Sequence, residues 1–557
     1  MSFANERSAS PSDNNYAWPP NNKKRIDWFS HWYRQTPSLP SLPEELLLLI
    51  TSHLEGDTPT LSHLSLTNRK LNRVTKETLY RSISVGKHVA SSSLIFLVRT
   101  LLQRPEYCSL VKNLWLSAYF YDKRGPVAGS LFPRHCFGRV VTDRFDKFGE
   151  SEYALLIDCC RKIDSWVPLT DRSGRRGAEL LVAQRWKAAV LQRQSPAFAA
   201  LLLALCPSLT FLSFDVSHTE GGGRLVLPRM FGFAAAEEVA EWEFCLSEEN
   251  LPVSFPGSPG LRMPEVRYLR VNVVNNIDIV RLGFGKLTTL DVGLYVHYGN
   301  SGSGMIEDRY GSTHVNPSRQ VKCIPGVRNL VFRVDYEELM LPSSGEQVSR
   351  FLRHVEFPQL VSLTIVLERS PREHWKWNRV RVSFERLISQ LRNPTAQTLL
   401  HNLEELKVLI TDDTAAFDKK FLHRFQPCTS LAWLPRLKKL TIPWQALTQS
   451  AGLTDQVLDT EEVLPVADLP PSLEVLRILY PHVHTPHQLA RMFESAMGQF
   501  SQLRELELLF NKHWGMLDGG LRPVWHRVLG GLPAKFSLDW TLSVKDEIKA
   551  LTASSSK

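Results

Sequence analysis

The apolar positions between residues 42 and 83 predict three short helices. Pro43 suits the first position of a helix, and Glu44 and Glu45 follow it at the positive end of the helix dipole. The next five residues, Leu46 to Ile50, are all apolar. Because helical residues advance by about 100° each, such a run surrounds the helix axis, whereas a surface helix needs only one apolar stripe. The first helix is therefore predicted to be covered on more than one side.

The second and third helices supply part of this cover. Asp57 or Thr58 can cap the second helix, and Thr67 or Asn68 can cap the third. A core of about 40 residues is usually too small to be stable by itself. The segment is therefore either one piece of a larger core or a docking module whose remaining apolar face belongs to a partner. Apolar residues recur at helical spacing in both helices, at Leu61, Leu64, Leu71, Val74 and Leu79.

In the order and spacing of these residues the segment resembles an F-box. The matching parts are Leu42-Pro43, the acidic and leucine-rich run to Ile50, and the segments Leu61–Thr67 and Leu79–Ile83. Many F-boxes carry a tryptophan in the third helix, where this chain has Asn72 and Arg73. The resemblance implies binding to a Skp-type adaptor, which links the chain to a cullin-RING ubiquitin ligase.

Carried over by position, the resemblance implies a set of adaptor-binding residues. Leu64 and Leu66, like Leu71 and Val74, either contact the adaptor or only hold the three helices together, and the sequence leaves both possibilities open. The implied adaptor-binding residues are Leu42, Pro43, Leu46, Leu47, Ile50, Leu64 and Leu66.

Beyond residue 84 a six-residue pattern recurs: apolar, two variable, leucine, one variable, apolar. Six of its ten copies have a proline just upstream, which ends a preceding helix and starts an extended segment. Alternation within each copy places the apolar residues on one side of a short strand. The ten copies begin at residues 111, 209, 266, 287, 327, 360, 403, 437, 473 and 503.

The copies resemble the strand portion of leucine-rich repeats. From residue 327 onward they are 30 to 43 residues apart, which leaves room for a strand, a return helix and loops. The 98 residues between the first two starts must hold an insertion or undetected repeats, and a generic α/β domain with short strands is the alternative. The predicted fold class is α/β, with a small three-helix F-box followed by a curved leucine-rich-repeat-like solenoid of parallel strands and outer helices. Return helices are predicted around residues 374–396, 412–426, 487–499 and 519–530.

Length, composition and charge predict an intracellular protein with several parts. A length of 557 residues exceeds one ordinary core, and a net charge of +9 is a weak bias that argues neither for a nucleic acid nor for a membrane. The scattered cysteines, the polar N-terminus and the absence of a long apolar run predict a cytoplasmic or nuclear protein without a membrane partner. The predicted organisation is a disordered arm over residues 1–38, an F-box over 39–84, a repeat-like substrate-binding domain over 85–545 and a disordered tail over 546–557.

Candidate chemical motifs do not complete a catalytic or metal-binding set. The segment Gly283–Leu287 lacks the first glycine and the Ser/Thr of a phosphate loop. The histidines of residues 482–487 have no cysteine or carboxylate beside them. The tryptophans and arginines of residues 372–381 could stack on bases, but a solvated junction is the commoner use of such a segment. We therefore expect no catalytic residue, no metal and no cofactor, and we disfavour a nucleic-acid partner.

A protein without catalytic residues is expected to act by binding. In a solenoid the variable strand positions line the concave face, and their mixed charge here favours a protein partner. The predicted function is a non-catalytic substrate-recognition subunit of an SCF-type ubiquitin ligase, which acts through proximity. Alternatives are a non-proteolytic F-box scaffold and a nucleic-acid-binding repeat protein. The candidate substrate-binding residues are Arg270, Asp291, Arg333, Lys407, Lys439, Arg477, Glu505 and Glu507.

Overall fold

A computed structural model of the chain shows two compact units, Met1–Tyr80 and Arg81–Lys557. The predicted tail over residues 546–557 and all but Ser38 of the predicted disordered arm lie outside the described residues. The structure describes residues 38–85, 90–119, 154–155, 201–203, 205–217, 263, 265–271, 284–294, 322–335, 352, 355–368, 382–392, 400–411, 425–428, 430–447, 468–481, 485, 489–490, 501–510, 522–530 and 535–540.

In the first unit three α-helices form where the apolar pattern predicts them. The side chain of Asp57 accepts a hydrogen bond of 3.2 Å from the Thr60 N–H and caps the second of these helices. Asn68 caps the third, because its Oδ1 accepts from the Leu71 N–H at 2.8 Å. Pro43 is the N-cap of the first helix rather than its first helical residue. The elements are η1 (Leu39–Ser41), α2 (Glu44–His53), α3 (Thr58–Thr67) and α4 (Arg69–Arg81).

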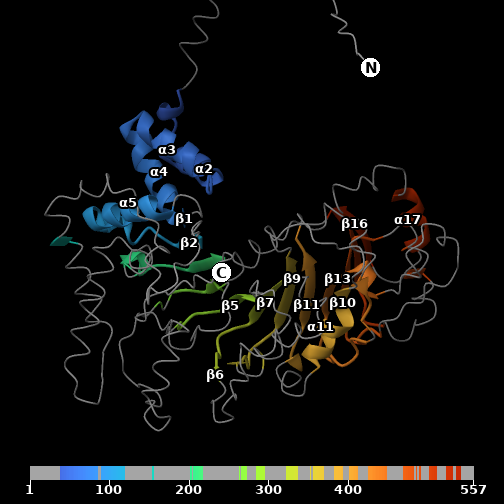
Figure 1. Ribbon diagram of the computed structural model, residues 1–557. Helices are drawn as coiled ribbons and strands as arrows, with labels where there is room; N and C mark the ends of the chain where they lie inside the picture. The colour runs from blue at the N-terminus through green and yellow to red at the C-terminus, as the bar shows by residue number, and fades with distance from the viewer. Residues whose placement is uncertain are drawn as a thin grey trace, which may run out of the picture. The chain divides into compact units, whose positions relative to one another are not determined.

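The second unit is built on a twelve-stranded sheet in which all neighbouring strands are parallel. The strands follow one another across the sheet in chain order, and Figure 1 shows this as a progression of colour along the sheet from blue to red. Helices at the N-terminus followed by a parallel sheet make the chain an α/β protein. The strands are β1 (Ser82–Val85), β2 (Asn113–Tyr119), β3 (Phe211–Ser217), β4 (Tyr268–Val271), β5 (Thr289–Leu294), β7 (Asn329–Asp335), β9 (Ser362–Glu368), β11 (Glu405–Ile410), β13 (Lys439–Pro443), β14 (Val475–Leu479), β15 (Glu505–Phe510) and β16 (Lys535–Trp540).

Shorter elements lie between these strands. Two further pairs of short strands, β6 with β8 and β10 with β12, are also parallel. The helix α5 contacts β1, and α17 contacts β16. These elements are α5 (Ala90–Gln103), η2 (Pro105–Tyr107), β6 (Lys322–Cys323), β8 (Val355–Glu356), β10 (Val382–Ser383), α11 (Phe384–Leu391), β12 (Phe425–Gln426), α15 (Trp444–Leu447) and α17 (Arg522–Leu529).

The invariant leucine of the recurring motif forms one continuous row through the sheet. Each of these leucines pairs in register with the leucine of the next strand. All ten are at most 1% exposed, and burial of one such side chain stabilises the fold by about 1.5–3 kcal/mol. The row therefore forms the central line of the core. It consists of Leu114, Leu212, Leu269, Leu290, Leu330, Leu363, Leu406, Leu440, Leu476 and Leu506.

A ladder of backbone hydrogen bonds joins successive turns just before the strands. The N–H groups of Thr288 and Thr289 both donate to the Arg267 carbonyl, each at 2.9 Å. The same arrangement recurs one strand further on, where the N–H groups of Arg328 and Asn329 donate to the Thr288 carbonyl. Since the pattern repeats along the sheet as far as β15, the backbone fixes the spacing of the turns at this edge.

The ten motif copies coincide with ten consecutive strands of the sheet, and two strands lie outside the prediction. The strand β1 overlaps the end of the predicted F-box, residues 39–84, and β16 follows the last copy. Of the predicted return helices, α11 lies within 374–396 and α17 within 519–530. The prediction of helix up to residue 426 is wrong at its end, because Phe425–Gln426 forms β12. Most of 412–424 and 487–499 lies outside the described residues.

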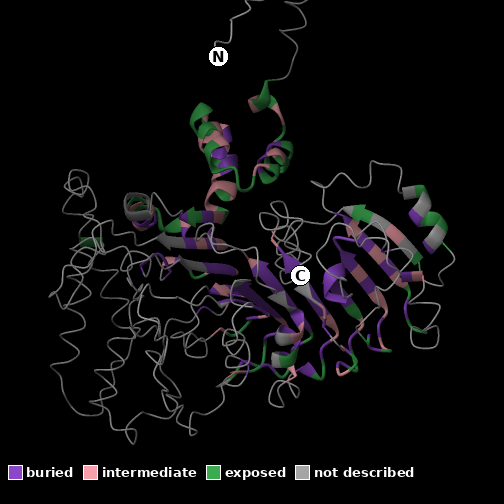
Figure 2. Ribbon diagram, turned by 45° about the vertical axis from the view of Figure 1, so that its right-hand side comes forward, coloured by how far each residue is buried: buried purple, intermediate pink, exposed green. Residues whose placement is uncertain are grey.

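Both faces of the sheet are buried in its central strands. Six of the seven residues of β9 are buried, and Figure 2 shows the middle of the sheet in purple. The face opposite the leucine row carries Val331, Val366 and Leu409, each at most 5% exposed. In β15, by contrast, buried and half-buried residues alternate. The expectation that each strand has one apolar face and one open face therefore holds for the last strands. It is wrong for the central strands, which are covered on both faces as is usual in parallel sheets.

Gly326 lies close to the backbone of the preceding turn, at Leu287. A Cβ atom added there would lie 2.8 Å from the Leu287 carbonyl oxygen, a backbone atom that cannot move aside cheaply. We expect Gly326→Ala to lower the free energy of unfolding by about 1–3 kcal/mol, measured by urea-induced unfolding of the full chain. The control is Gln359→Ala, because Gln359 holds the equivalent position before the next strand and is exposed. Equal stability of the two variants would contradict the packing argument.

Candidate functional site

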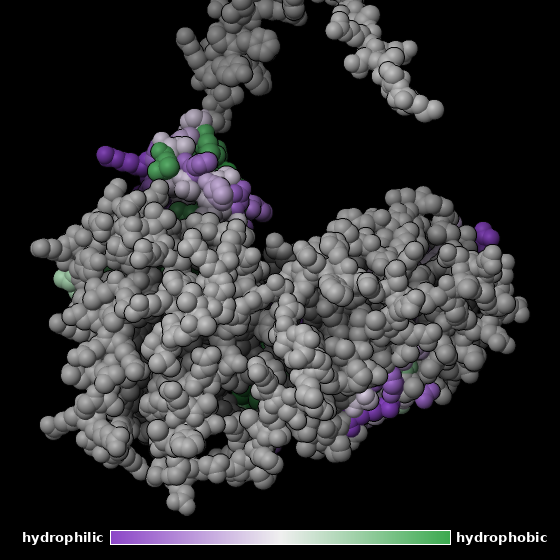
Figure 3. Space-filling model, viewed as in Figure 1, coloured by the Kyte–Doolittle hydropathy of each residue, from purple (hydrophilic) through white to green (hydrophobic). Residues whose placement is uncertain are grey.

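The leucine run of α2 is divided between the inside and the outside of the first unit. Leu47 is 1% exposed, whereas Leu46, Leu48 and Leu49 are 46%, 40% and 55% exposed. Figure 3 shows hydrophobic side chains, in green, among hydrophilic ones on the surface of this unit. Large apolar side chains that stay exposed so close together are a common sign of a binding surface.

The core beneath the exposed leucines is small and comes from all three helices. Leu47, Leu71 and Val74 form a buried cluster, and Leu42 and Leu64 pack against it while half-buried. The prediction that Leu47 contacts the adaptor is therefore corrected, because its side chain is enclosed by its own unit. Leu64 packs against this core and is only half-buried, so both alternatives for it stay open.

The segment that precedes α2 is fixed to α4 by a lysine. Lys70 Nζ donates to the carbonyl oxygens of Pro40 and Leu42, at 3.1 and 2.6 Å. An ion pair between Arg73 and Glu44 then joins α4 to the first turn of α2. These bonds tie the start of α2 to α4, the helix whose Leu71 and Val74 enclose Leu47.

The remaining predicted contact residues are at least partly accessible. Pro43 is exposed, Ile50 is half-buried, and Leu66 of α3 is 79% exposed. Leu48 and Leu49 are exposed as well but were not among the predicted contact residues, although both lie in the leucine run. Five consecutive apolar residues have no period, so no sequence signal separates the inward leucine from the outward ones.

On the sheet, the predicted substrate-binding residues of β5 and β7 form a buried network instead of an open surface. Arg333 Nε lies 2.7 and 3.0 Å from the two carboxylate oxygens of Asp291, and Nη2 lies 2.9 Å from Oδ2. Tyr268 Oη donates to Asp291 Oδ2 at 2.6 Å, and the Arg333 guanidinium also pairs with Glu368. Asp291 is 0% and Arg333 3% exposed, so their assignment to substrate contact is corrected.

Burial and charge act in opposite directions on this network. Burial alone raises the pKa of Asp291, but the cations of Arg333 and Arg270 and the hydrogen bonds outweigh it, so that the pKa is lowered. Burial, followed by the Asp291 charge, raises the pKa of Tyr268 well above its ordinary value, which keeps the hydroxyl protonated as a donor. The network is therefore an internal structural element with its charges matched.

Among the other candidates, Lys407 is also enclosed while four residues of the later strands are accessible. Lys407 is 7% exposed and pairs with Glu405 of its own strand at 3.4 Å, so its assignment to substrate contact is corrected too. Arg270 is half-buried, with a buried Nε that has no described hydrogen-bond partner. The accessible candidates are Lys439, Arg477, Glu505 and Glu507.

The accessible candidates include one ion pair between neighbouring strands. Arg477 Nε lies 2.8 Å from Glu507 Oε2, but its N–H does not point at that oxygen. The pair is held by charge and by a longer hydrogen bond of 3.4 Å from Nη2 to Oε1. Side chains held this loosely can exchange their internal partner for an external one at small cost.

Comparison with known proteins identifies the first unit. A family model described as F-box-like matches residues 39–85, so this segment is an F-box-like domain. The match includes β1, which belongs to the second unit by its contacts. F-box domains generally bind Skp-type adaptors. A search of the curated proteins found no match for the chain.

The described part of the chain lacks two further features. No helix there is long and apolar enough to cross a membrane. Within the same residues, no three His, Cys, Asp or Glu side chains gather as they would around a metal ion. The four described cysteines, Cys108, Cys206, Cys323 and Cys428, are free thiols.

Proposed function

We propose that the chain is a non-catalytic substrate-recognition subunit of an SCF-type ubiquitin ligase in the cytoplasm or nucleus. The observation that carries the proposal is the exposure of Leu46, Leu48 and Leu49 on α2 of an F-box-like domain. A Skp-type adaptor would cover these side chains and bring the chain to a cullin. The contribution to catalysis is proximity between a bound substrate and the ubiquitin-charged enzyme.

The second part of the proposal is that the sheet belongs to a leucine-rich-repeat-like solenoid. Its support is the coincidence of ten motif copies with ten consecutive parallel strands in chain order. Repeats that stack on their neighbours give a continuous leucine row of this kind. The described helices α5, α11 and α17 lie in the crossovers, where return helices are expected.

A protein substrate would bind on β14 and β15, near the C-terminal end of the sheet. There the face opposite the leucine row stays accessible, with Arg477, Glu505 and Glu507 in adjacent strands. The mixed charge of this surface suits a protein partner better than a polyanion, which would meet the carboxylates.

The proposal is tested by comparing ubiquitination in cells that express the full chain or its Leu46→Asp/Leu49→Asp variant. We expect some proteins to lose most of their ubiquitination, at least about tenfold, in the variant, because a receptor without its adaptor cannot present them. The control is Leu155→Asp, which changes a comparably exposed leucine of the second unit. A different outcome is that the unmodified chain binds the adaptor while no protein differs in ubiquitination or abundance between cells with the unmodified chain and cells with the variant. In that case the non-proteolytic scaffold is the better description.

A further inference from the structure

Sulfur-containing side chains occupy equivalent positions in three successive turns of the second unit. Cys108, Cys206 and Met263 each lie five positions before the first residue of β2, β3 and β4, which pair in register. The three residues are buried, at 9%, 2% and 6% exposed. Four of the later turns carry a buried hydrocarbon side chain in the same position, so the sulfur is concentrated in these three turns. The four hydrocarbon residues are Ile324, Phe357, Leu400 and Leu434.

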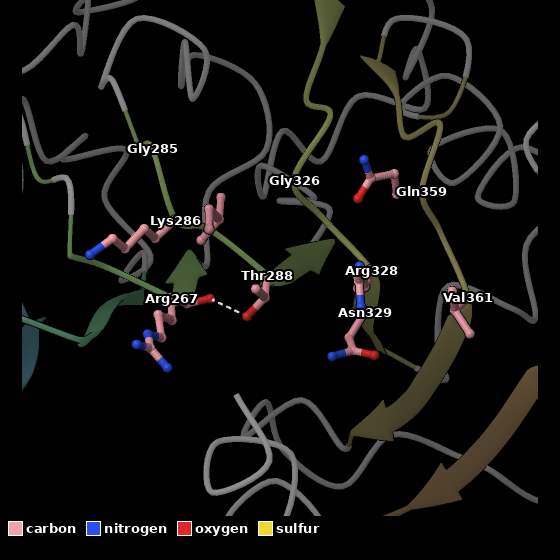
Figure 4. A pocket seen from close by; sticks show the side chains of 10 residues that line it. Arg267, Gly285, Lys286, Thr288, Gly326, Arg328, Asn329, Gln359 and Val361 are labelled. Atoms are coloured by element: carbon pink, nitrogen blue, oxygen red, sulfur yellow. Dashed lines mark hydrogen bonds between the residues drawn. The ribbon is translucent and has the colours of Figure 1, made fainter. Parts of the chain in front are cut away.

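Hydrogen bonds hold these turns at a fixed distance from one another. The Thr210 N–H and the Thr210 hydroxyl both donate to the Lys112 carbonyl, at 2.8 and 3.2 Å. The Arg267 N–H donates to the Thr210 carbonyl at 2.8 Å. Figure 4 shows the hydroxyl bond repeated further along the sheet, from Thr288 to the Arg267 carbonyl at 3.1 Å. Because hydrogen-bonded neighbouring strands lie about 4.8 Å apart, residues in equivalent positions of successive turns are separated by about this distance.

The two cysteines are free thiols, and one of them has no partner. Cys108 Sγ donates to the Leu101 carbonyl of α5 at 3.6 Å, which is a weak bond. Among the described residues, none forms a hydrogen bond with Cys206 Sγ. Burial raises the pKa of both thiols, and the Cys108 charge adds to the effect on the pKa of Cys206, so the two groups are within electrostatic reach. Since the thiolate is the form that reacts with oxidants, this pair is poorly suited to a reversible disulfide.

We propose that Cys108, Cys206 and Met263 bind a monovalent copper ion. Thiolate and thioether sulfur are the soft ligands that select Cu(I). A bond between a thiolate and a metal ion such as Zn²⁺ is about 2.3 Å long, so two such bonds span about 4.6 Å, close to the spacing of neighbouring turns. The ion replaces the protons of Cys108 and Cys206, which pass to the solvent, and forms two copper–thiolate bonds. The Met263 thioether is the third and weaker ligand.

The ligand set favours copper over zinc. Structural zinc sites almost always have four ligands from cysteine, histidine and carboxylates. In the described part of the chain no third side chain of these types joins the two cysteines. Monovalent copper is stable with two or three sulfur ligands, which is the number that the three turns supply. No metal was expected from the sequence, because Cys108 and Cys206 meet only through the register of β2 and β3.

The site closes the two longest crossovers between motif copies. Cys108 and Cys206 are 98 positions apart, and Cys206 and Met263 are 57 apart, whereas later copies begin at most 43 positions after the preceding one. A cross-link that closes a long loop removes more entropy from the unfolded chain than one that closes a short loop. Bound copper is therefore expected to stabilise the second unit, and the inference does not depend on the proposed ligase function.

The test titrates the reduced full chain with Cu(I) in competition with the chelator bathocuproine disulfonate, without oxygen. Every protein carries Cys159→Ser/Cys160→Ser, because adjacent cysteines can bind Cu(I) by themselves. We expect one copper ion per chain, with only sulfur neighbours in its X-ray absorption spectrum. Cys206→Ala should weaken binding at least about a hundredfold and Met263→Leu at most about tenfold, since even outer-shell partners change metal affinity about 10–100-fold. Copper should also raise the urea midpoint of the parent chain and leave that of Cys206→Ala unchanged.

The matched control is Cys428→Ala. Cys428 is also a buried free thiol, but the charged groups that affect its pKa are Glu385 and Arg392 and not a second thiol. Loss of all copper from the parent chain to the chelator overturns the proposal, as does retention by Cys206→Ala or an equal loss in Cys428→Ala. Nitrogen or oxygen neighbours in the absorption spectrum overturn it as well. If Cys206→Ala does not fold, Met263→Leu decides, because it keeps the core volume, and unchanged binding in this variant contradicts the three-sulfur site.

Discussion

Replacement of Leu46 and Leu49 by aspartate is expected to weaken binding of a Skp-type adaptor by at least about a hundredfold. The two side chains are 46% and 55% exposed in the free chain, so each has apolar surface that a partner can cover. Burial of a leucine is worth about 1.5–3 kcal/mol, and every 1.4 kcal/mol corresponds to about tenfold in affinity. A carboxylate in the same contact adds its own desolvation cost. Titration calorimetry of the full chain with purified adaptor measures the change.

Two controls separate loss of contact from loss of folding. Leu155→Asp alters a leucine that is 44% exposed in the second unit and should leave the affinity unchanged. Leu47→Ala, by contrast, removes a core side chain and is expected to lower the stability of the F-box-like unit by about 2–5 kcal/mol. The adaptor surface is wrongly placed if the aspartate variant binds like the wild type, or if it loses binding only together with its helical circular dichroism.

The strand positions could be predicted because the leucine row has a fixed period. Each of the ten motif copies puts one leucine, such as Leu330 or Leu406, where a strand must bury it. The burial of the sheet face opposite the leucine row was not predicted, although the sequence indicates it. Val331, Val366 and Leu409 stand at positions that were treated as variable, and nearly continuous apolar runs are typical of parallel strands buried on both faces.

The contacts within the candidate sites could not be predicted for two reasons. Rotation of α2 decides whether Leu46 or Leu47 faces inward, and the leucine run has no period from which to infer it. The pairing of Asp291 with Arg333 joins residues 42 positions apart and depends on the register between β5 and β7. The sequence shows only one acidic and one basic residue at strand positions, which predicts a charged surface as readily as a buried pair.

Breaking the buried pair between Asp291 and Arg333 is expected to destabilise the sheet strongly. Asp291→Ala leaves the Arg333 cation and the Tyr268 hydroxyl without their central partner. Removal of one member of a buried ion pair typically costs about 3–5 kcal/mol. We expect a loss of that size in the free energy of unfolding, measured by urea-induced unfolding of the full chain.

The matched control replaces both charges with apolar side chains of similar size. Asp291→Leu/Arg333→Met leaves neither member of the pair without the other. Its loss in the free energy of unfolding should therefore be smaller, by at least about 1 kcal/mol, than the sum of the losses in Asp291→Leu and in Arg333→Met. Strictly additive losses would show that the two side chains do not interact as the geometry indicates. Lys439→Met, at an exposed position of β13, should change stability by no more than about 0.5 kcal/mol.

The same pair makes stability depend on pH in a defined direction. The folded-state pKa of Asp291 is lowered, since Arg333 and Arg270 outweigh the effect of burial, while the unfolded chain has a pKa of about 3.9. A lowered carboxyl pKa contributes stability that is fully present above the unfolded pKa and is lost as the pH falls through the folded pKa. The stability difference between wild type and Asp291→Asn should therefore be constant above about pH 5 and shrink below about pH 4. A difference that stays constant or grows on acidification would contradict the assignment of an ionised Asp291 in the folded protein.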